Sequence, residues 1–229
     1  MGLAAFIGFF HTLIGPDHYV PFIAMARAGR WSQSKTMMVV VLCGLGHVAG
    51  SVLLGSFGVG LGWAVESLER TESARADLAS WLLLGFGLAY LLWGIRAAIR
   101  GTTHVHLHAH ADGTVHAHPH HHHGEHVHVH AGRLQGARVT PWVLFTIFIF
   151  GPCEPLIPIL MYPAAAMNTK AVVAVTIVFA AATLATMTGL VILGSIRLAQ
   201  ASSSRLERYS QAGAGVAIII CGLTIKLGL

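Results

Sequence analysis

The chain has 229 residues, of which 55% are hydrophobic and only 10% are charged, and its mean hydropathy is +0.68. A soluble domain carries roughly 25% charged residues, so this composition indicates an integral membrane protein. The net charge of +5 is modest, and no basic surface with interleaved aromatic residues is visible, which argues against nucleic acid as a partner.

Six apolar stretches are each long enough to cross a bilayer as a helix, which takes about 20 residues. Lipid offers the backbone no hydrogen-bond partners, so all six are expected to be helical. The first lacks a basic start and a small-residue cleavage site, so it is interpreted as a retained span and not as a signal peptide. The expected spans are 2–27, 37–64, 78–99, 140–167, 171–196 and 209–228.

The first span contains HTLIGPDH, residues 11–18. A carboxylate at the centre of a membrane costs about 3 kcal/mol, which favours a functional role for Asp17 and its neighbour His18. The preceding Gly15-Pro16 pair predicts a broken helix, since proline removes a backbone donor. In an unbroken helix His11 and His18 would lie about 10.5 Å apart along the axis, too far for one ion. All three polar residues are candidate metal ligands if the break shortens this distance, and a kink stabilised by hydrogen bonds is the alternative.

The second span carries His47 within GLGHVAG. The glycines that flank it permit close helix packing, which is consistent with a histidine that faces the bundle interior. A single intramembrane histidine is more often a packed residue than a ligand. Three histidines together with Asp17 in one half of the chain favour the ligand role for His47.

A polar segment, 100–139, follows the third span, and 13 of the chain's 16 histidines lie between residues 104 and 130 in it. Its repetitive composition predicts disorder in the absence of metal. Histidine-rich tracts bind first-row divalent ions, so we predict that this loop collects or buffers metal, with a solvated spacer as the alternative. The candidate ligands are His104, His106, His108, His110, His116, His118, His120, His121, His122, His123, His126, His128 and His130.

The fourth span contains a second Gly-Pro pair in GPCEPLIP, followed by Cys153 and Glu154. The pattern predicts a second broken helix at the position equivalent to the first. Asp17 and Glu154 are interpreted as the only acidic residues deep in any span. We therefore expect the two breaks to approach one another, with Glu154 and Cys153 as further candidate metal ligands.

The two halves of the chain resemble each other in three places, in the same order. GPDHYVP matches GPCEPLIP, SKTMMVVV matches TKAVVAVT, and GFGLAYLLWGI matches GAGVAIIICGL. Each half has three spans, so the second copy is inverted across the membrane, an arrangement typical of transporters. The predicted fold is an all-α integral membrane protein, with six transmembrane helices as a 3+3 inverted repeat and a broken first helix in each half. The predicted units are 1–99, the histidine-rich loop 100–139, and 140–229.

Lysine and arginine residues near the span ends predict the orientation. The connections after spans one, three and five hold ten of them, and the opposite side holds four, namely Arg70, Arg75, Lys170 and Lys226. We expect an inner (plasma) membrane protein with both termini outside and the histidine-rich loop in the cytoplasm.

HTLIGPDH and the Leu45-Gly46-His47 tripeptide resemble motifs of the nickel/cobalt transporter family and its efflux and urease-accessory-protein-H-like relatives. That family's first motif has four residues between the histidine and Asp-His, whereas this chain has five between His11 and Asp17. The histidine-rich cytoplasmic loop resembles the efflux branch. The resemblance implies ligand roles for Asp17, His18 and His47, with His11 displaced by one residue from its place in the motif. Taken with the residues around the second Gly-Pro pair, we expect Asp17, His18 and His47 to be the main ligands, with Glu154, His11 and Cys153 behind them.

The expected function is secondary transport of Ni²⁺ or Co²⁺, with Zn²⁺ as a further candidate, by alternating access and without a prosthetic group. No nucleotide-binding motif or nucleophile–base pair is visible, so an enzyme is not expected. Besides metal ions and the lipid bilayer, a cytoplasmic metal-delivery protein and a second copy of the chain are candidate partners. GPCEPLIP also resembles the Pro-Cys motif of thiol-electron carriers of the cytochrome-c-biogenesis type, which makes a redox carrier that uses Cys153 the alternative.

Overall fold

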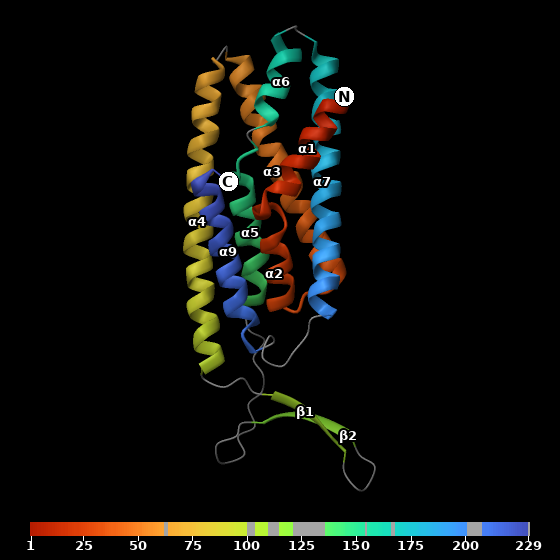
Figure 1. Ribbon diagram of the computed structural model, residues 1–229, viewed down its shortest axis with the longest axis vertical. Coiled ribbons are helices and arrows are strands. Elements are labelled where there is room, and N and C mark those ends of the chain that lie inside the picture. The colour runs from red at the N-terminus through yellow and green to blue at the C-terminus, as the bar shows by residue number, and fades with distance from the viewer. Residues whose placement is uncertain are drawn as a thin grey trace.

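A computed structural model describes residues 1–61, 64–99, 104–109, 115–120, 136–153, 155–165, 168–200 and 208–228 (Figure 1). The helices are α1 (Gly2–Ile14), η1 (Pro16–His18, a 3₁₀ turn), α2 (Val20–Ala28), α3 (Gln33–Gly60), α4 (Val65–Ile99), α5 (Gly136–Phe150), α6 (Leu156–Ala165), α7 (Thr169–Gln200) and α9 (Ser210–Leu227). The strands are β1 (His104–Ala109) and β2 (Val115–His120).

Four helices in the described part of the chain, α3, α4, α7 and α9, are long and apolar enough to cross a membrane. Large apolar side chains such as Phe57 and Ile99, 69% and 75% exposed, point away from the bundle. An outer surface of this kind suits lipid and not water. The bundle is therefore compatible with a multi-pass membrane protein.

Both expected helix breaks are present. α1 ends at Ile14, and the chain makes the single turn η1 before α2 begins at Val20. α5 ends at Phe150, and the next helix, α6, begins at Leu156. Proline cannot donate the next helical hydrogen bond, which explains why each helix stops beside its Gly-Pro pair.

Helices distant in the sequence pack side by side: α4 with α9, α1 with α7, and α3 with α5 (Figure 1). α4 and α9 run antiparallel and approach most closely at glycines. A Cβ atom added to Gly215 would lie 2.4 Å from the backbone nitrogen of Leu91, and one added to Gly94 would lie 2.4 Å from that of Ala212. Only glycine permits this backbone separation.

α4 begins 13 residues earlier than the expected third span, at Val65 and not at residue 78. The expected spans leave the charged segment 66–77 as a connection, but it contains strong helix formers and continues the helix. Glu66 and Arg70 form an i,i+4 ion pair of 2.7 Å there. Arg75 accordingly lies inside a helix and not in a loop.

The histidine-rich loop is not wholly irregular, in contrast to the expected disorder. β1 and β2 form an antiparallel pair in which His104, His106 and His108 lie opposite His120, His118 and His116. The alternation of histidine with apolar residues has the period of a β-strand, which explains the pairing. By register, the six histidines of the two strands pair only with one another.

Candidate metal site

Three histidines from three elements meet beside the first helix break. The rings of His11 and His18 have centroids 4.6 Å apart, and those of His18 and His47 have centroids 5.1 Å apart. The turn η1 folds the chain back after Gly15, so His18 lies near His11 and not two helical turns away. The break therefore brings together residues that a continuous helix would separate.

The imidazoles are withdrawn from solvent and incompletely hydrogen-bonded. His18 and His47 are 2% and 3% exposed. Among the described residues, the buried Nε2 atoms of His11 and His18 and both ring nitrogens of His47 have no hydrogen-bond partner. Buried polar atoms in native proteins nearly always have a partner, so four such nitrogens at one place indicate a site for a ligand.

Asp17 and the backbone orient the central histidine. The Nδ1 atom of His18 lies 3.2 Å from the carboxylate of Asp17 and 3.2 Å from the carbonyl oxygen of Gly15. When Nδ1 carries the proton it donates to these oxygens, which leaves Nε2 as a free acceptor. Asp17 also supplies a negative charge next to the three rings.

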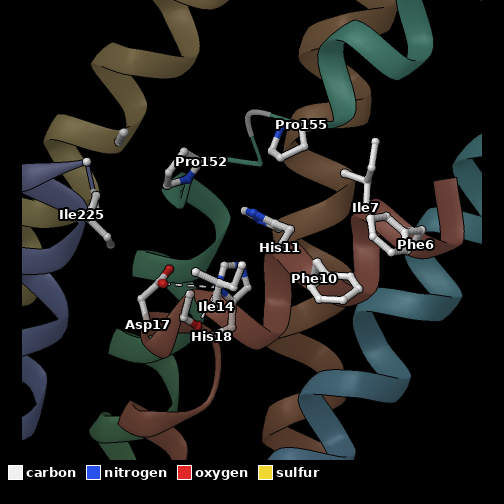
Figure 2. A pocket seen from close by; sticks show the side chains of 13 residues that line it. Phe6, Ile7, Phe10, His11, Ile14, Asp17, His18, Pro152, Pro155 and Ile225 are labelled. Atoms are coloured by element: carbon white, nitrogen blue, oxygen red, sulfur yellow. Dashed lines mark hydrogen bonds and ion pairs between the residues drawn. The ribbon is translucent and has the colours of Figure 1, made fainter. Parts of the chain in front are cut away.

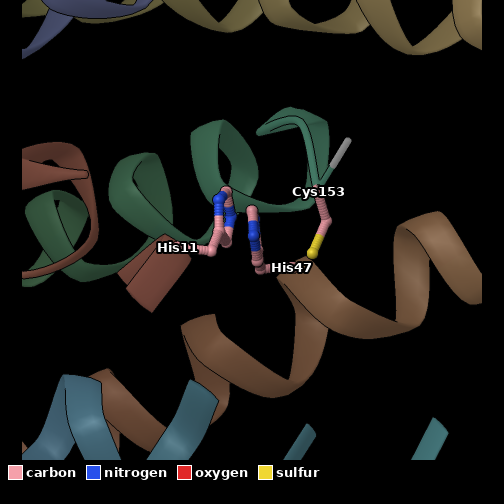
Figure 3. Close-up of side chains that lie close together, drawn as sticks. All are labelled: His11, His47 and Cys153. Carbon is pink, nitrogen blue, oxygen red and sulfur yellow. The ribbon is translucent and has the colours of Figure 1, made fainter. Parts of the chain in front are cut away.

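The second break contributes a thiol to the same place. Figure 3 shows the side chains of His11, His47 and Cys153 close together. Their ligand atoms all lie within 4.8 Å of one another. Ligands around a tetrahedral zinc lie about 3.5 Å apart, so small side-chain movements would bring these three atoms to binding distance. Cys153 is fully buried, and its neighbour Gly151 packs against the ring of His47.

A cavity of about 430 Å³ opens beside these residues (Figure 2). Its polar lining is formed by His11, Asp17 and His18, and Pro152 and Pro155 of the second break also line it. The apolar lining of the cavity includes three residues of α1, namely Phe6, Phe10 and Ile14. The two breaks thus face one cavity, as their equivalent positions in the sequence led us to expect.

The donor set determines what the site can hold. Imidazole nitrogen, thiolate sulfur and carboxylate oxygen suit a borderline divalent transition metal such as Ni²⁺, Co²⁺ or Zn²⁺. They suit Mg²⁺ poorly, because that ion prefers oxygen ligands and retains water. The cluster of His11, His47 and Cys153 is therefore one that can bind a transition metal.

Of the six candidate ligands in the spans, the structure brings five to this site: His11, Asp17, His18, His47 and Cys153. The sixth, Glu154, lies outside the described residues. Of the loop histidines, six lie in β1 and β2, and the other seven lie outside the described residues.

Sequence reasoning missed a charged pair close to the second break, in which Glu72 is buried and Arg75 is half-buried. Glu72 and Arg75 form an ion pair of 2.8 Å, with side chains 1% and 15% exposed. The expectation that Asp17 and Glu154 are the only acidic residues deep in any span is therefore wrong, because the buried Glu72 lies in α4. The i,i+3 spacing of Glu72 and Arg75 could have revealed the pair, had the segment been interpreted as a helix.

In comparisons with known proteins, no family model, curated protein or solved structure matches the chain.

Proposed function

We propose that the chain is a secondary transporter that moves Ni²⁺ or Co²⁺ across the membrane. The observation that supports it best is the group of buried, unpartnered imidazole nitrogens of His11, His18 and His47 inside an apolar bundle. In a membrane such groups are costly, and their usual use is an ion pathway. The adjacent cavity of about 430 Å³ offers room for an ion and its remaining water.

Each donor has a part in this proposal. His11 and His47 offer nitrogen ligands from two helices, and His18 offers a third that Asp17 orients through Nδ1. The carboxylate offsets part of the charge of a divalent ion that has lost water. These ligands must shed protons to bind, so metal movement is coupled to protons in this proposal. Cys153 adds a softer donor.

The packing of the helices supports the proposed six-span inverted repeat. The pairs α1 with α7 and α3 with α5 would be equivalent under exchange of the two halves. In α4 and α9, Gly87 and Gly215 occupy matching places in the repeated sequence, and each packs against the other's backbone carbonyl. Alternating access would then be a movement of one half against the other around the metal site.

Metal flux into proteoliposomes tests this proposal against the redox alternative. Wild-type protein should move Ni²⁺ or Co²⁺ but not Mg²⁺. Cys153→Ser should retain at least about a tenth of the wild-type flux, because the imidazole and carboxylate ligands remain. Cys43→Ser is the matched control, since Cys43 packs in a separate core cluster. Absence of metal flux in the wild type, with Cys153 trapped in a mixed disulfide during turnover, would support the thiol-electron carrier.

The histidine-rich loop has an accessory role in the proposed function. Deletion of residues 104–130 should raise the metal concentration needed for half-maximal flux by about tenfold or less, while the maximal flux stays close to that of the wild type. The reason is that the buried donors of the bundle remain. Flux in proteoliposomes measures the half-maximal metal concentration and the maximal flux, and calorimetry measures metal binding. Complete loss of flux in a folded, inserted deletion variant would contradict the accessory role.

A further inference from the structure

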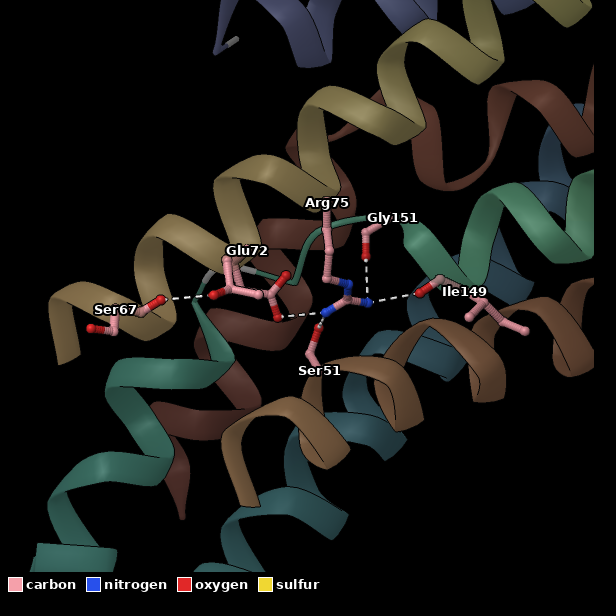
Figure 4. Close-up of polar contacts among 7 residues, drawn as sticks. Ser51, Ser67, Glu72, Arg75, Ile149 and Gly151 are labelled. Atoms are coloured by element: carbon pink, nitrogen blue, oxygen red, sulfur yellow. Dashed lines mark hydrogen bonds and ion pairs between the residues drawn. The ribbon is translucent and has the colours of Figure 1, made fainter. Parts of the chain in front are cut away.

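The guanidinium group of Arg75 binds the backbone at the end of α5, as Figure 4 shows. Its Nη2 atom donates to the carbonyl oxygen of Ile149 at 2.7 Å and lies 3.4 Å from that of Gly151. Its Nη1 atom donates to Oγ of Ser51 at 3.1 Å and to the carboxylate of Glu72 at 2.8 Å. One side chain of α4 thus joins α3 to the second helix break.

The sequence of the break explains why an outside donor is needed there. In a continuous helix the N–H of residue 155 would bond the carbonyl of Gly151, but Pro155 has no N–H. Pro152 likewise cannot donate to Phe148, whose carbonyl accepts from the N–H of Gly151 instead, at 3.1 Å. The last carbonyls of α5 carry the negative end of the helix dipole, which makes a cation their favoured partner.

The surrounding residues accommodate a half-buried cation. Glu72 neutralises the charge of Arg75, so the pair does not leave an isolated charge in the bundle. A Cβ atom added to Gly50 would lie 2.7 Å from Nη2 of Arg75 and 2.8 Å from the carbonyl oxygen of Ile149. The glycine in α3 therefore provides the space in which guanidinium and carbonyl meet.

The two breaks are held in different ways. In the first, the side chain of His18 contacts the carbonyl of Gly15 directly, so the metal-site residues stabilise their own turn. In the second, Arg75 contacts the carbonyl of Gly151, which lies two residues before Cys153 in the chain. The position of the thiol relative to His11 and His47 consequently depends on a residue that does not belong to the cluster of candidate ligands.

We propose that Arg75 is a positioning residue that holds the Gly151 carbonyl, and with it the Cys153 thiol, within reach of the metal, and so sets the preference for thiolate-binding ions. This inference rests on the proposed metal site. Metal binding by the thiol releases its proton, and the sulfur then coordinates as thiolate. Without Arg75 the break would relax, and the ion would be held by imidazole and carboxylate alone.

Co²⁺ added to purified full-length protein in detergent tests this role, because thiolate-to-Co²⁺ charge transfer absorbs separately from the bands of histidine-bound Co²⁺. The wild type should show this band and Cys153→Ser should lack it, which assigns it to Cys153. Arg75→Gln should reduce the band by about tenfold while histidine-bound Co²⁺ persists. Arg75→Lys should retain an intermediate band, since an ammonium can bond one carbonyl but cannot bridge four acceptors.

A second pair of variants covers the case in which Arg75→Gln fails to fold. Gly50→Ala places a methyl group where the guanidinium lies and should also weaken the band, whereas Gly55→Ala, which meets only Leu160 at 3.5 Å, should not. Arg70→Gln, an exposed arginine of the same helix, is the control for charge. A wild-type band in folded Arg75→Gln or Gly50→Ala would overturn the positioning role and leave the proposed function standing. Absence of any bundle-bound Co²⁺ in the wild type would overturn both.

Discussion

Asp17→Asn should reduce metal flux by about 100-fold or more, while expression and insertion stay at or above wild-type levels. The substitution preserves size and one hydrogen-bond acceptor, so the contact with Nδ1 of His18 at 3.2 Å can persist. It removes the negative charge beside the three imidazoles. In a low-dielectric cavity a divalent ion that has shed water then lacks compensation, and binding should fail.

Matched variants separate this effect from a structural role of the break. Asp77→Asn removes a carboxylate that is 60% exposed and pairs with Lys226, and it should leave flux unchanged. Pro16→Ala restores a backbone donor at the kink and should affect flux less than Asp17→Asn. If the stretch only stabilises a kink, Pro16→Ala should instead reduce flux more than Asp17→Asn. Wild-type flux through Asp17→Asn, measured per folded molecule in proteoliposomes, would contradict the metal site.

Gly215→Ala should destabilise the protein by about 1–3 kcal/mol, as expected for overpacking against rigid groups. The added methyl would lie 2.4 Å from the nitrogen and 2.6 Å from the Cα atom of Leu91, and 2.8 Å from the carbonyl oxygen of Gly87. All three are backbone atoms, which no rotamer change can move. α4 and α9 must therefore separate along the contact that joins the two halves.

Gly213→Ala is the control for this variant. Gly213 lies on the same helix, two residues earlier, and a Cβ atom there meets nothing within 4 Å. Alanine has a helix propensity up to about 1 kcal/mol better than glycine, so this variant should be neutral or more stable. Denaturation in detergent of the two variants should give changes of opposite sign. Equal changes in the free energy of unfolding would contradict the close packing of α4 and α9.

The sequence alone determined the membrane-like character of the helices and the position of both breaks. These features depend on local chemistry: long apolar runs require spans, and proline at residues 16 and 152 removes donors wherever the rest of the chain lies. The same local reasoning identified His18 and Cys153 as unusual residues for their surroundings.

Distances across the fold were decided only by the tertiary structure. Helix periodicity placed His11 and His18 two turns apart, whereas the turn η1 brings their rings to 4.6 Å. No local pattern could show that Cys153 reaches His47, since their proximity depends on how α3 packs against the second break.

Arg75 illustrates the same limit. In the sequence it stands in a charged segment that also suits a solvated connection, and nothing local distinguishes it from Arg70. The structure extends α4 through both residues, leaves Arg70 exposed, and places the half-buried Arg75 against the buried Glu72. The difference arises because Arg75 faces carbonyls at the end of α5, which the helix break leaves without helical partners. That pairing exists only once separate helices have packed together.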